Sequence, residues 1–366
     1  MKNSIGTSVI LTLAGESHGE AIVAVLDGMA PGLPVDESFM AEQLRKRRPQ
    51  GPTDTARREA DNYRILSGVF NGKTTGAPIT ILIPNENILS ADYAATHTLA
   101  RPSHADYTAH IKYDGCEDWR GGGHFSGRIT AGIVAAGAIA LQALQAKGIT
   151  VGTHILSCAG IQDLPFDGID PELTASQIRK VAALDFPVIS NVREAMEARI
   201  LEAKADGDSV GGTIQTAVCG LPAGVGEPWF GSLEGALANA IFSIGGIKGV
   251  EFGSGFSLAG MRGSEANDNF VVKDGAILTS SNHSGGINGG ISNGMPVIFK
   301  AAVKPTPSIA KAQETIDMQS GETATLELRG RHDPAIVRRI CIVVSSLTAV
   351  VLCDMLALRF GTDYLR

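Results

Sequence analysis

The sequence predicts a protein of the α+β class, on three observations. Residues 8–14 and 20–27 are short apolar blocks that flank a glycine-bounded turn, as antiparallel strands do. Residues 127–147 carry Ala and Gly on most faces, which is typical of a helix packed closely at the centre of a protein. The helices and strands that follow lack regular βαβ spacing, so the pattern indicates mixed α and β structure rather than a parallel α/β sheet.

The remaining elements are predicted from caps and turns. Asp36 is a suitable N-cap for a helix over 37–47, which Pro49 stops. Residues 62–70 and 78–84 are expected to form strands of a hairpin around Asn71-Gly72, a strong turn signal. Further strands are predicted over 150–159 and 210–219, and further helices over 171–184 and 191–204.

Composition limits the function classes. The 366 residues would suit two domains by the usual size rule, although single domains of this length exist. A formal net charge of -7 argues against a nucleic-acid binder, which needs a basic surface. Five cysteines without a C-x-x-C pair suit reduced thiols, and residues 1–14 lack a signal-peptide pattern, so we expect a cytoplasmic protein. Residues 340–357 approach membrane length, but their polar positions favour a buried helix, and no membrane association is expected.

The segment from Arg101 to Arg128 has the chemistry of an anion site. It contains several arginines, two histidines in the runs 101–107 and 119–128, and the glycines 121–123. Glycine lets backbone N–H groups approach an oxyanion, and arginine binds phosphate or carboxylate in bidentate fashion. The run is neither a Walker loop nor a G-x-G-x-x-G fingerprint, and no residue set has zinc spacing, so no metal is predicted.

Local sequence leaves alternatives open at each candidate residue. His18 is either a proton carrier or an ordinary surface-turn histidine. His104 follows Arg101 by three residues, so both can face one ligand, with Asp106 available to orient the imidazole. The basic run 45–48 reads more readily as a solvated helix face, and Asp333 more readily as an N-cap for the segment after Pro334, a normal helix start.

Nine ordered motifs together resemble the chorismate synthase family, and the match spans nearly the whole chain. The motifs are Gly15-Glu16-Ser17-His18-Gly19, Arg47-Arg48-Pro49, Ser67-Gly68-Val69-Phe70, Arg101-Pro102-Ser103-His104-Ala105-Asp106, Arg120-Gly121-Gly122-Gly123, Lys248-Gly249-Val250-Glu251, Gly289-Gly290-Ile291-Ser292-Asn293-Gly294, Lys304-Pro305-Thr306 and Gly330-Arg331-His332-Asp333-Pro334.

The resemblance implies a fold and an activity. The expected fold is a single domain over residues 1–366, a three-layer β-α-β sandwich with antiparallel sheets around central helices, assembled as a homotetramer. The expected activity is that of a lyase of the shikimate pathway for aromatic amino acid biosynthesis. It converts 5-enolpyruvylshikimate 3-phosphate to chorismate by 1,4-anti elimination of phosphate, with reduced FMN and no net redox change. It stays open whether this flavoprotein reduces its own FMN with NADPH, an NADP-linked step, or binds FMN that has already been reduced.

The resemblance also assigns roles to residues. His18 would serve the departing phosphate, His104 the flavin, and Asp333 the flavin N5 region that accepts the substrate proton. The substrate would be held by Arg47, Arg101 and Arg128. The flavin contacts would be His124, Phe125, Ser126, Asn239, Ala240, Gly289, Lys304, Pro305, Thr306, Pro307, Ser308 and Arg331.

The chain departs from the common family pattern in two places. His124-Phe125 stands where many members have Arg-Ser, and Ile129 where they have Glu. Thr53 lies near the usual place of an arginine, for which Arg57 or Arg58 would substitute. Two rival functions are a flavin oxidoreductase, whose flavin would change oxidation state in turnover, and a noncatalytic phosphometabolite-binding protein.

Overall fold

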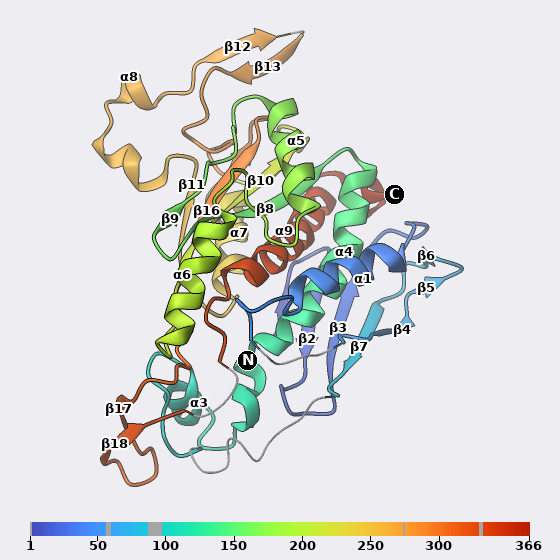
Figure 1. Ribbon diagram of the computed structural model, residues 1–366. Coiled ribbons are helices and arrows are strands. Elements are labelled where there is room, and N and C mark those ends of the chain that lie inside the picture. The colour runs from blue at the N-terminus through green and yellow to red at the C-terminus, as the bar shows by residue number, and fades with distance from the viewer. Residues whose placement is uncertain (1, 56–59, 87–96, 274, 329–331) are drawn as a thin grey trace.

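The computed structural model describes residues 2–55, 60–86, 97–273, 275–328 and 332–366, which form two five-stranded antiparallel sheets (Figure 1). The first sheet has the strand order β1 (Ser4–Ile5), β2 (Ile10–Ala14), β3 (Ala21–Asp27), β7 (Ile79–Pro84) and β4 (Arg64–Ser67). The second has the order β11 (Ile247–Phe252), β16 (Val297–Val303), β10 (Gly212–Cys219), β8 (Thr150–Cys158) and β9 (Ile161–Gln162). All these pairings are antiparallel, as the family resemblance implied.

Two-stranded ribbons extend from the sheets. They are β5 (Val69–Phe70) with β6 (Lys73–Thr74), β12 (Phe270–Lys273) with β13 (Ala276–Thr279), β14 (Ile287–Asn288) with β15 (Ile291–Ser292), and β17 (Gln313–Ile316) with β18 (Thr323–Leu326). The turn between β5 and β6 is the predicted Asn71-Gly72, and φ is +49° and +69° at these two residues, the left-handed values that a tight hairpin turn needs.

Four of the α-helices lie close to the predicted ranges 37–47, 127–147, 171–184 and 191–204. The α-helices are α1 (Glu37–Arg47), α3 (Asp106–Lys112), α4 (Thr130–Ala146), α5 (Pro171–Ala182), α6 (Arg193–Ala205), α7 (Leu233–Phe242), α8 (Gly263–Ala266) and α9 (Val337–Phe360). Short 3-10 helices are η1 (Arg120–Phe125), η2 (Gly127–Ile129), η3 (Trp229–Gly231), η4 (Gly255–Gly260) and η5 (Thr362–Leu365). Asp36 caps α1 as predicted, because its side chain accepts from the amides of Ser38 and Phe39.

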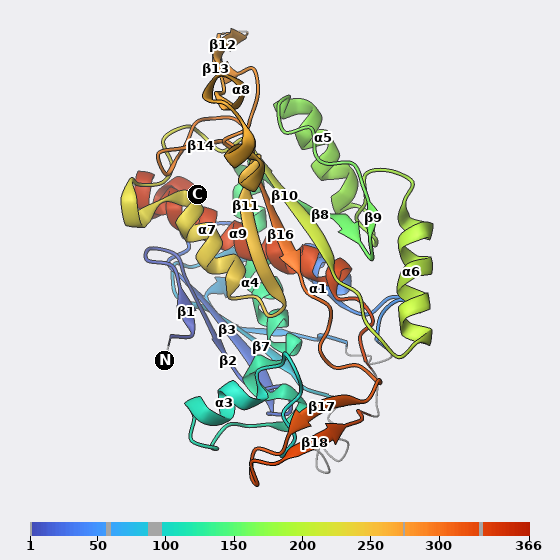
Figure 2. The ribbon, with the colours of Figure 1, turned by 90° about the vertical axis from the view of Figure 1, so that its left-hand side faces the viewer.

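The helices α4 and α9 form the centre of the molecule. α4 packs on β3 and β7 of the first sheet and along α9, while α9 packs on β8 and β10 of the second sheet (Figure 2). Close approach of the two helices depends on Gly137, where a methyl group would stand 2.4 Å from Cβ of Ser346. Ala and Gly at the contact therefore allow two long helices to share the space between the sheets.

Both central helices are apolar enough to cross a membrane by length, yet both are mostly enclosed by protein. Of the most apolar window, 78% is buried in the helix that ends at Ala146 and 94% in α9. The prediction of a buried helix over 340–357 is therefore confirmed. α9 begins at Val337, three residues after Pro334, so the prediction that Pro334 opens the helix in its first turn is wrong.

Candidate active site

The turn between β2 and β3 places His18 inside the protein. His18 is 5% exposed, and Ser17 beside it is fully buried. The turn is held by Asn85, whose amide group donates to the carbonyls of Glu16 and Gly19 at 3.0 and 2.8 Å. The surface-turn alternative for His18 is therefore wrong, because Asn85 holds the turn against the body of the protein.

The glycine run forms a loop that separates His18 from His104. Gly121, Gly122 and Gly123 in η1 all have positive φ, at +61°, +83° and +53°. A methyl group at Gly121 would stand 2.5 Å from Nε2 of His18, and one at Gly122 would stand 3.4 Å from Cε1 of His104. Glycine is needed here for both its backbone conformation and its lack of a side chain.

Arg101, His104 and Asp106 form one centre, as their spacing predicted. Asp106 accepts from Nε and Nη2 of Arg101, each at 2.7 Å, and lies 2.7 Å from Nδ1 of His104. Burial alone would raise the pKa of Asp106, but hydrogen bonds from Arg101 and His104 outweigh it and hold that pKa below its ordinary value. The ionised Asp106 therefore fixes Nδ1 of His104 as a donor and leaves Nε2 for proton exchange.

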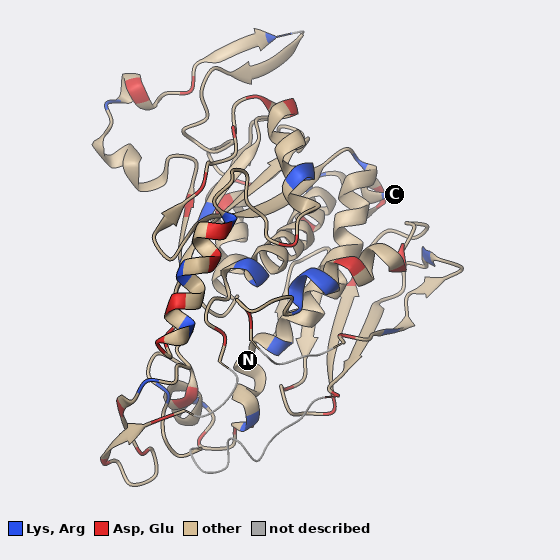
Figure 3. Cartoon of the chain, viewed as in Figure 1, with Lys and Arg blue, Asp and Glu red and all other residues tan. Residues whose placement is uncertain are grey.

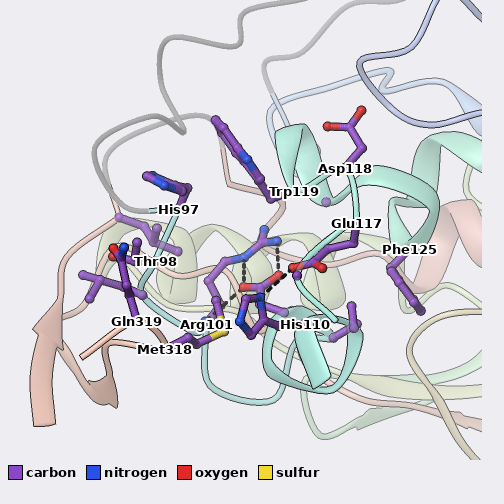
Figure 4. A pocket seen from close by; sticks show the side chains of 17 residues that line it. His97, Thr98, Arg101, His110, Glu117, Asp118, Trp119, Phe125, Met318 and Gln319 are labelled. Atoms are coloured by element: carbon purple, nitrogen blue, oxygen red, sulfur yellow. Dashed lines mark hydrogen bonds and ion pairs between the residues drawn. The ribbon is translucent and has the colours of Figure 1, made fainter. Parts of the chain in front are cut away.

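A cavity of about 360 Å³ opens beside this centre (Figure 4). Arg101, Asp106 and Gly122 line it together with the tilted pair His97 and Trp119, whose ring centroids are 4.9 Å apart. Phe125 lies at another side of the same space. The cavity thus gives a small molecule access to Arg101 and to the glycine loop.

A second, fully buried centre joins Arg47 and Arg128 through Asp61. Arg47 binds Asp61 through Nη2 at 2.7 Å, and Nη1 of Arg128 contacts the other carboxylate oxygen. Burial would raise the pKa of Asp61, but the charges of Arg47 and Arg128 hold it below its ordinary value. The solvated-face alternative is therefore wrong for Arg47, which is 7% exposed.

Asp61 and Asn85 are site residues that sequence reasoning missed. Oδ1 of Asn85 accepts from Nε of Arg128 at 2.8 Å, so the residue that holds the His18 turn also orients Arg128. Asp61 lies 14 positions from Arg47 and 67 from Arg128. Neither separation matches a local pattern, so the sequence carried no signal for these pairs.

Asp333 is paired with Arg339 and does not cap a helix. Its Oδ2 lies 2.6 Å from Nη2 of Arg339, and the N-cap position of α9 belongs to Ile336. The N-cap interpretation of Asp333 is therefore wrong. Burial raises the pKa of Asp333, and Arg339 opposes this shift. The charge of Arg339 also contributes to lowering the pKa of Arg47, after burial as the main cause.

The segment from Lys304 to Ser308 lies against the Arg101 centre. Nζ of Lys304 donates to the carbonyl of Ser103, and Nη1 of Arg101 donates to Oγ of Ser308 at 3.4 Å. Oγ1 of Thr306 is buried and has no hydrogen-bond partner among the described residues. Pro305 and Pro307 alternate with these polar residues and restrict the backbone of the segment.

The other predicted flavin contacts are spread over three elements. Nδ1 of His124 donates to the carbonyl of Gly15 at 2.8 Å, Phe125 is 43% exposed, and Oγ of Ser126 accepts from the amide of Arg128. Asn239 and Ala240 lie on α7, which packs on α9 and β11, and Gly289 lies in the turn from β14 to β15. Arg331, Arg57 and Arg58 lie outside the described residues.

A buried histidine and an oriented histidine, with several arginines on an α+β fold, are typical of an enzyme that acts on a small molecule. Comparison with known proteins gives the particular family. The chain belongs to the chorismate synthase family, because residues 9–357 match the family described as chorismate synthase. It is accordingly a lyase of the shikimate pathway, and both rival functions lose support.

Relatives named chorismate synthase are similar over nearly their whole length. The chain is 44% identical to one from Dehalococcoides mccartyi, over 99% of this chain and 98% of that protein. It is 42% identical to one from Methanococcoides burtonii, over 96% and 95%. A solved structure described as the crystal structure of chorismate synthase matches with a TM-score of 0.78 at 29% identity, covering 98% of this chain and 94% of that one.

Proposed function

We propose that this chain converts 5-enolpyruvylshikimate 3-phosphate to chorismate by 1,4-anti elimination of phosphate, with reduced FMN bound and no net redox change. The observation that carries the proposal is the placement of two histidines against neighbouring glycines. His18 faces Gly121 and His104 faces Gly122, so two proton-carrying groups lie against one short glycine loop.

The arginines supply the anion binding that this substrate needs. The substrate carries a phosphate and two carboxylates, and Arg47, Arg101 and Arg128 would bind them. Arg101 remains bound to Asp106 on one edge, whereas Arg47 and Arg128 share Asp61. Substrate oxygens would add to these pairs and complete the neutralisation of positive charge in a buried place.

Each proton role follows from the partners of the residue. His18 protonates the leaving phosphate, because phosphate leaves more readily when protonated. His104 donates from Nε2 toward the flavin, since Asp106 holds Nδ1. Asp333 has a raised pKa and a contact with Arg339, so it would help a bound reduced flavin to take up the proton removed from the substrate ring.

The residues present fit a reduced flavin mononucleotide. The unpartnered hydroxyl of Thr306, with Lys304 and Ser308, offers donors for a phosphate. The glycine loop at 121–123 lets the side chains of His18 and His104 lie directly against its backbone, since a methyl group at Gly121 or Gly122 would contact them. The full proposed set is His124, Phe125, Ser126, Asn239, Ala240, Gly289, Lys304, Pro305, Thr306, Pro307, Ser308 and Arg331. When bound, reduced FMN supplies transient electron density that eases cleavage of the C–O bond.

Single-turnover measurements test the assignment. The variants His18→Gln and His104→Gln, mixed without oxygen with substrate and photoreduced FMN, should each release phosphate about 10²–10⁴ times more slowly. His283→Gln is the matched control, because His283 contacts Ser254 in a different part of the chain. Near-normal release by either site variant would remove that histidine from the mechanism. Lasting flavin oxidation in step with turnover would instead support an oxidoreductase.

The source of reducing equivalents requires a separate assay. We propose supply of reduced FMN or reduction by NADPH at this chain as the two routes. Turnover with oxidised FMN and NADPH alone under anaerobic conditions would show the second route. Turnover only after photoreduction would show the first.

We propose that residues 1–366 form one domain, a three-layer β-α-β sandwich, and a cytoplasmic homotetramer. One continuous core supports the single domain, since it joins Leu11 of the first sheet, Ile139 of α4 and Phe299 of the second. Large apolar side chains exposed on η3, η4 and the β12–β13 ribbon support subunit contact: Trp229, Phe230, Phe256, Phe270 and Val272. Light scattering on the eluted protein should give four times the chain mass.

A further inference from the structure

Arg338 lies in the first turn of α9, and its guanidinium group donates several hydrogen bonds near the site. Its side chain is only 7% exposed. Nε and Nη2 donate to the two carboxylate oxygens of Asp54 at 3.3 and 2.7 Å. Nη1 and Nη2 also donate to the backbone carbonyls of Lys46 and Arg48, at 3.1 and 2.8 Å.

The two carbonyls are those on either side of Arg47. They lie at the C-terminal end of α1, where carbonyl groups lack partners within the helix and a positive charge is favourable. Figure 3 shows Lys and Arg positions, in blue, both at this end of α1 and at the start of α9. Arg338 therefore binds the backbone on both sides of Arg47, the residue that the proposed function assigns to the substrate.

Asp54 extends the same contact into the loop after α1. Its Oδ2 accepts from the amide of Gln50 at 2.8 Å, and its own amide donates to the carbonyl of Gly51 at 3.1 Å. Asp54 is 3% exposed, so this pair is shielded from water. One guanidinium thus ties together the end of α1, the loop 49–54 and the start of α9.

We propose that Arg338, with Asp54, is a positioning residue that sets substrate affinity by fixing the backbone of Arg47. This inference rests on the proposed role of Arg47. A guanidinium is required because a lysine presents a single nitrogen, which cannot reach a carboxylate and two carbonyls at once. The next residue, Arg339, contacts Asp333, so the same turn of α9 also places a group of the proposed proton path.

The test is a double-mutant cycle on the full-length protein with 5-enolpyruvylshikimate 3-phosphate as the probe. Its variants are Arg338→Lys, Arg47→Lys and the double variant, with binding measured by calorimetry and KM and kcat by the anaerobic assay. We expect Arg338→Lys to weaken binding and raise KM about tenfold with little change in kcat, as for loss of an interaction made equally in ground and transition states. The double variant should bind about as weakly as Arg47→Lys alone, because Arg338 acts through Arg47.

A matched control and a second variant keep the outcome clear. Arg45→Lys alters an exposed arginine of the same helix, paired with Glu42 and Asp185, and should leave affinity unchanged. Asp54→Asn removes one partner of Arg338 and should weaken binding in the same direction, which tests the proposal even where Arg338→Lys folds poorly. A global loss of folded protein would lower the apparent kcat and leave KM unchanged, which would overturn the proposal.

The result separates this inference from the function on which it rests. Losses that multiply in the double variant, or an unchanged affinity in both Arg338→Lys and Asp54→Asn, would overturn the positioning role while Arg47 keeps its own. An unchanged affinity in Arg47→Lys would overturn the substrate role of Arg47 and the inference with it.

Discussion

Asp61 and Asp106 each hold arginines of the site, but the two centres differ in their access to water. The Asp61 side chain is fully buried between Arg47 and Arg128, whereas Asp106 is 19% exposed beside a cavity of about 360 Å³. Asp61 is the shared countercharge of two buried guanidinium groups and offsets one of their two positive charges. Asp106 holds one arginine and one histidine at the edge of an open space.

The two carboxylates therefore have different roles, one in the stability of the fold and one in the orientation of site residues. A buried carboxylate between two arginines is needed for folding, since either charge alone would be costly without water. A carboxylate at a cavity wall is needed for orientation, since it fixes a tautomer and a guanidinium plane while the other faces stay available. We therefore expect changes at Asp61 to act first on stability and changes at Asp106 to act first on chemistry.

The largest effect should come from Asp61→Asn. This change leaves Arg47 and Arg128 without their shared countercharge, and breaking such a buried pair costs about 3–5 kcal/mol of unfolding free energy. Urea denaturation at neutral pH measures the change. A loss below about 1 kcal/mol, the value for exposed pairs, would show that water reaches this centre.

Asp106→Asn should cost less, about 2 kcal/mol at neutral pH, because the lost hydrogen bonds involve charged groups at a partly exposed position. The folded pKa of Asp106 is lowered, so the carboxylate contributes stability above the ordinary aspartate pKa of about 3.9 and loses it as pH falls toward the folded value. Denaturation at pH 6 and pH 3 should show the difference from the unmodified protein shrinking at the lower pH. A difference that grows with acidity would contradict the assigned direction.

Gly121→Ala should cost about 1–2 kcal/mol, the penalty for a side chain in the left-handed region. It should also slow turnover by more than about tenfold, because the methyl group would displace the His18 ring. Gly72→Ala is the matched control, since its φ of +69° carries a similar backbone cost and no atom lies within 4 Å of the added methyl. Equal activity in the two variants would mean that Gly121 does not set the position of His18.

Asp118→Asn should have the smallest effect, about 0.5 kcal/mol, since surface pairs contribute little. Asp118 binds Arg120 in bidentate fashion at 2.8 Å, but that arginine side chain is 44% exposed. Thermal unfolding in low and high salt measures the contribution. If Asp118→Asn lowered the free energy of unfolding as much as Asp106→Asn does, burial would not explain the order of these effects.

Much of the fold could be predicted because its elements are encoded locally. α1 has the predicted bounds, since Asp36 caps it and a proline follows it, and the hairpin turn at Asn71-Gly72 depends on two adjacent residues. The start of α9 was misplaced at Pro334 because proline is compatible with the first turn of a helix but does not require one.

The site could be predicted only in part. Arg101, His104 and Asp106 were expected together, because five residues suffice to bring them into contact. The exposure of Arg47 was predicted wrongly, since nothing in the run 45–48 shows that Asp61 lies opposite its third member. Arg338 gave no sign of its role, because its partners Asp54, Lys46 and Arg48 lie 284 to 292 positions away.

The sequence alone determined the short-range features of this protein, namely caps, glycine turns, the apolar central helices and the motifs that identify the chorismate synthase family. The tertiary structure alone decided which carboxylate neutralises which arginine and which histidine each glycine faces. The physical reason is the separation along the chain over which each interaction acts. Backbone preferences act between neighbours, whereas the pairing of buried charges is set by a free energy that exists only after distant segments have excluded water.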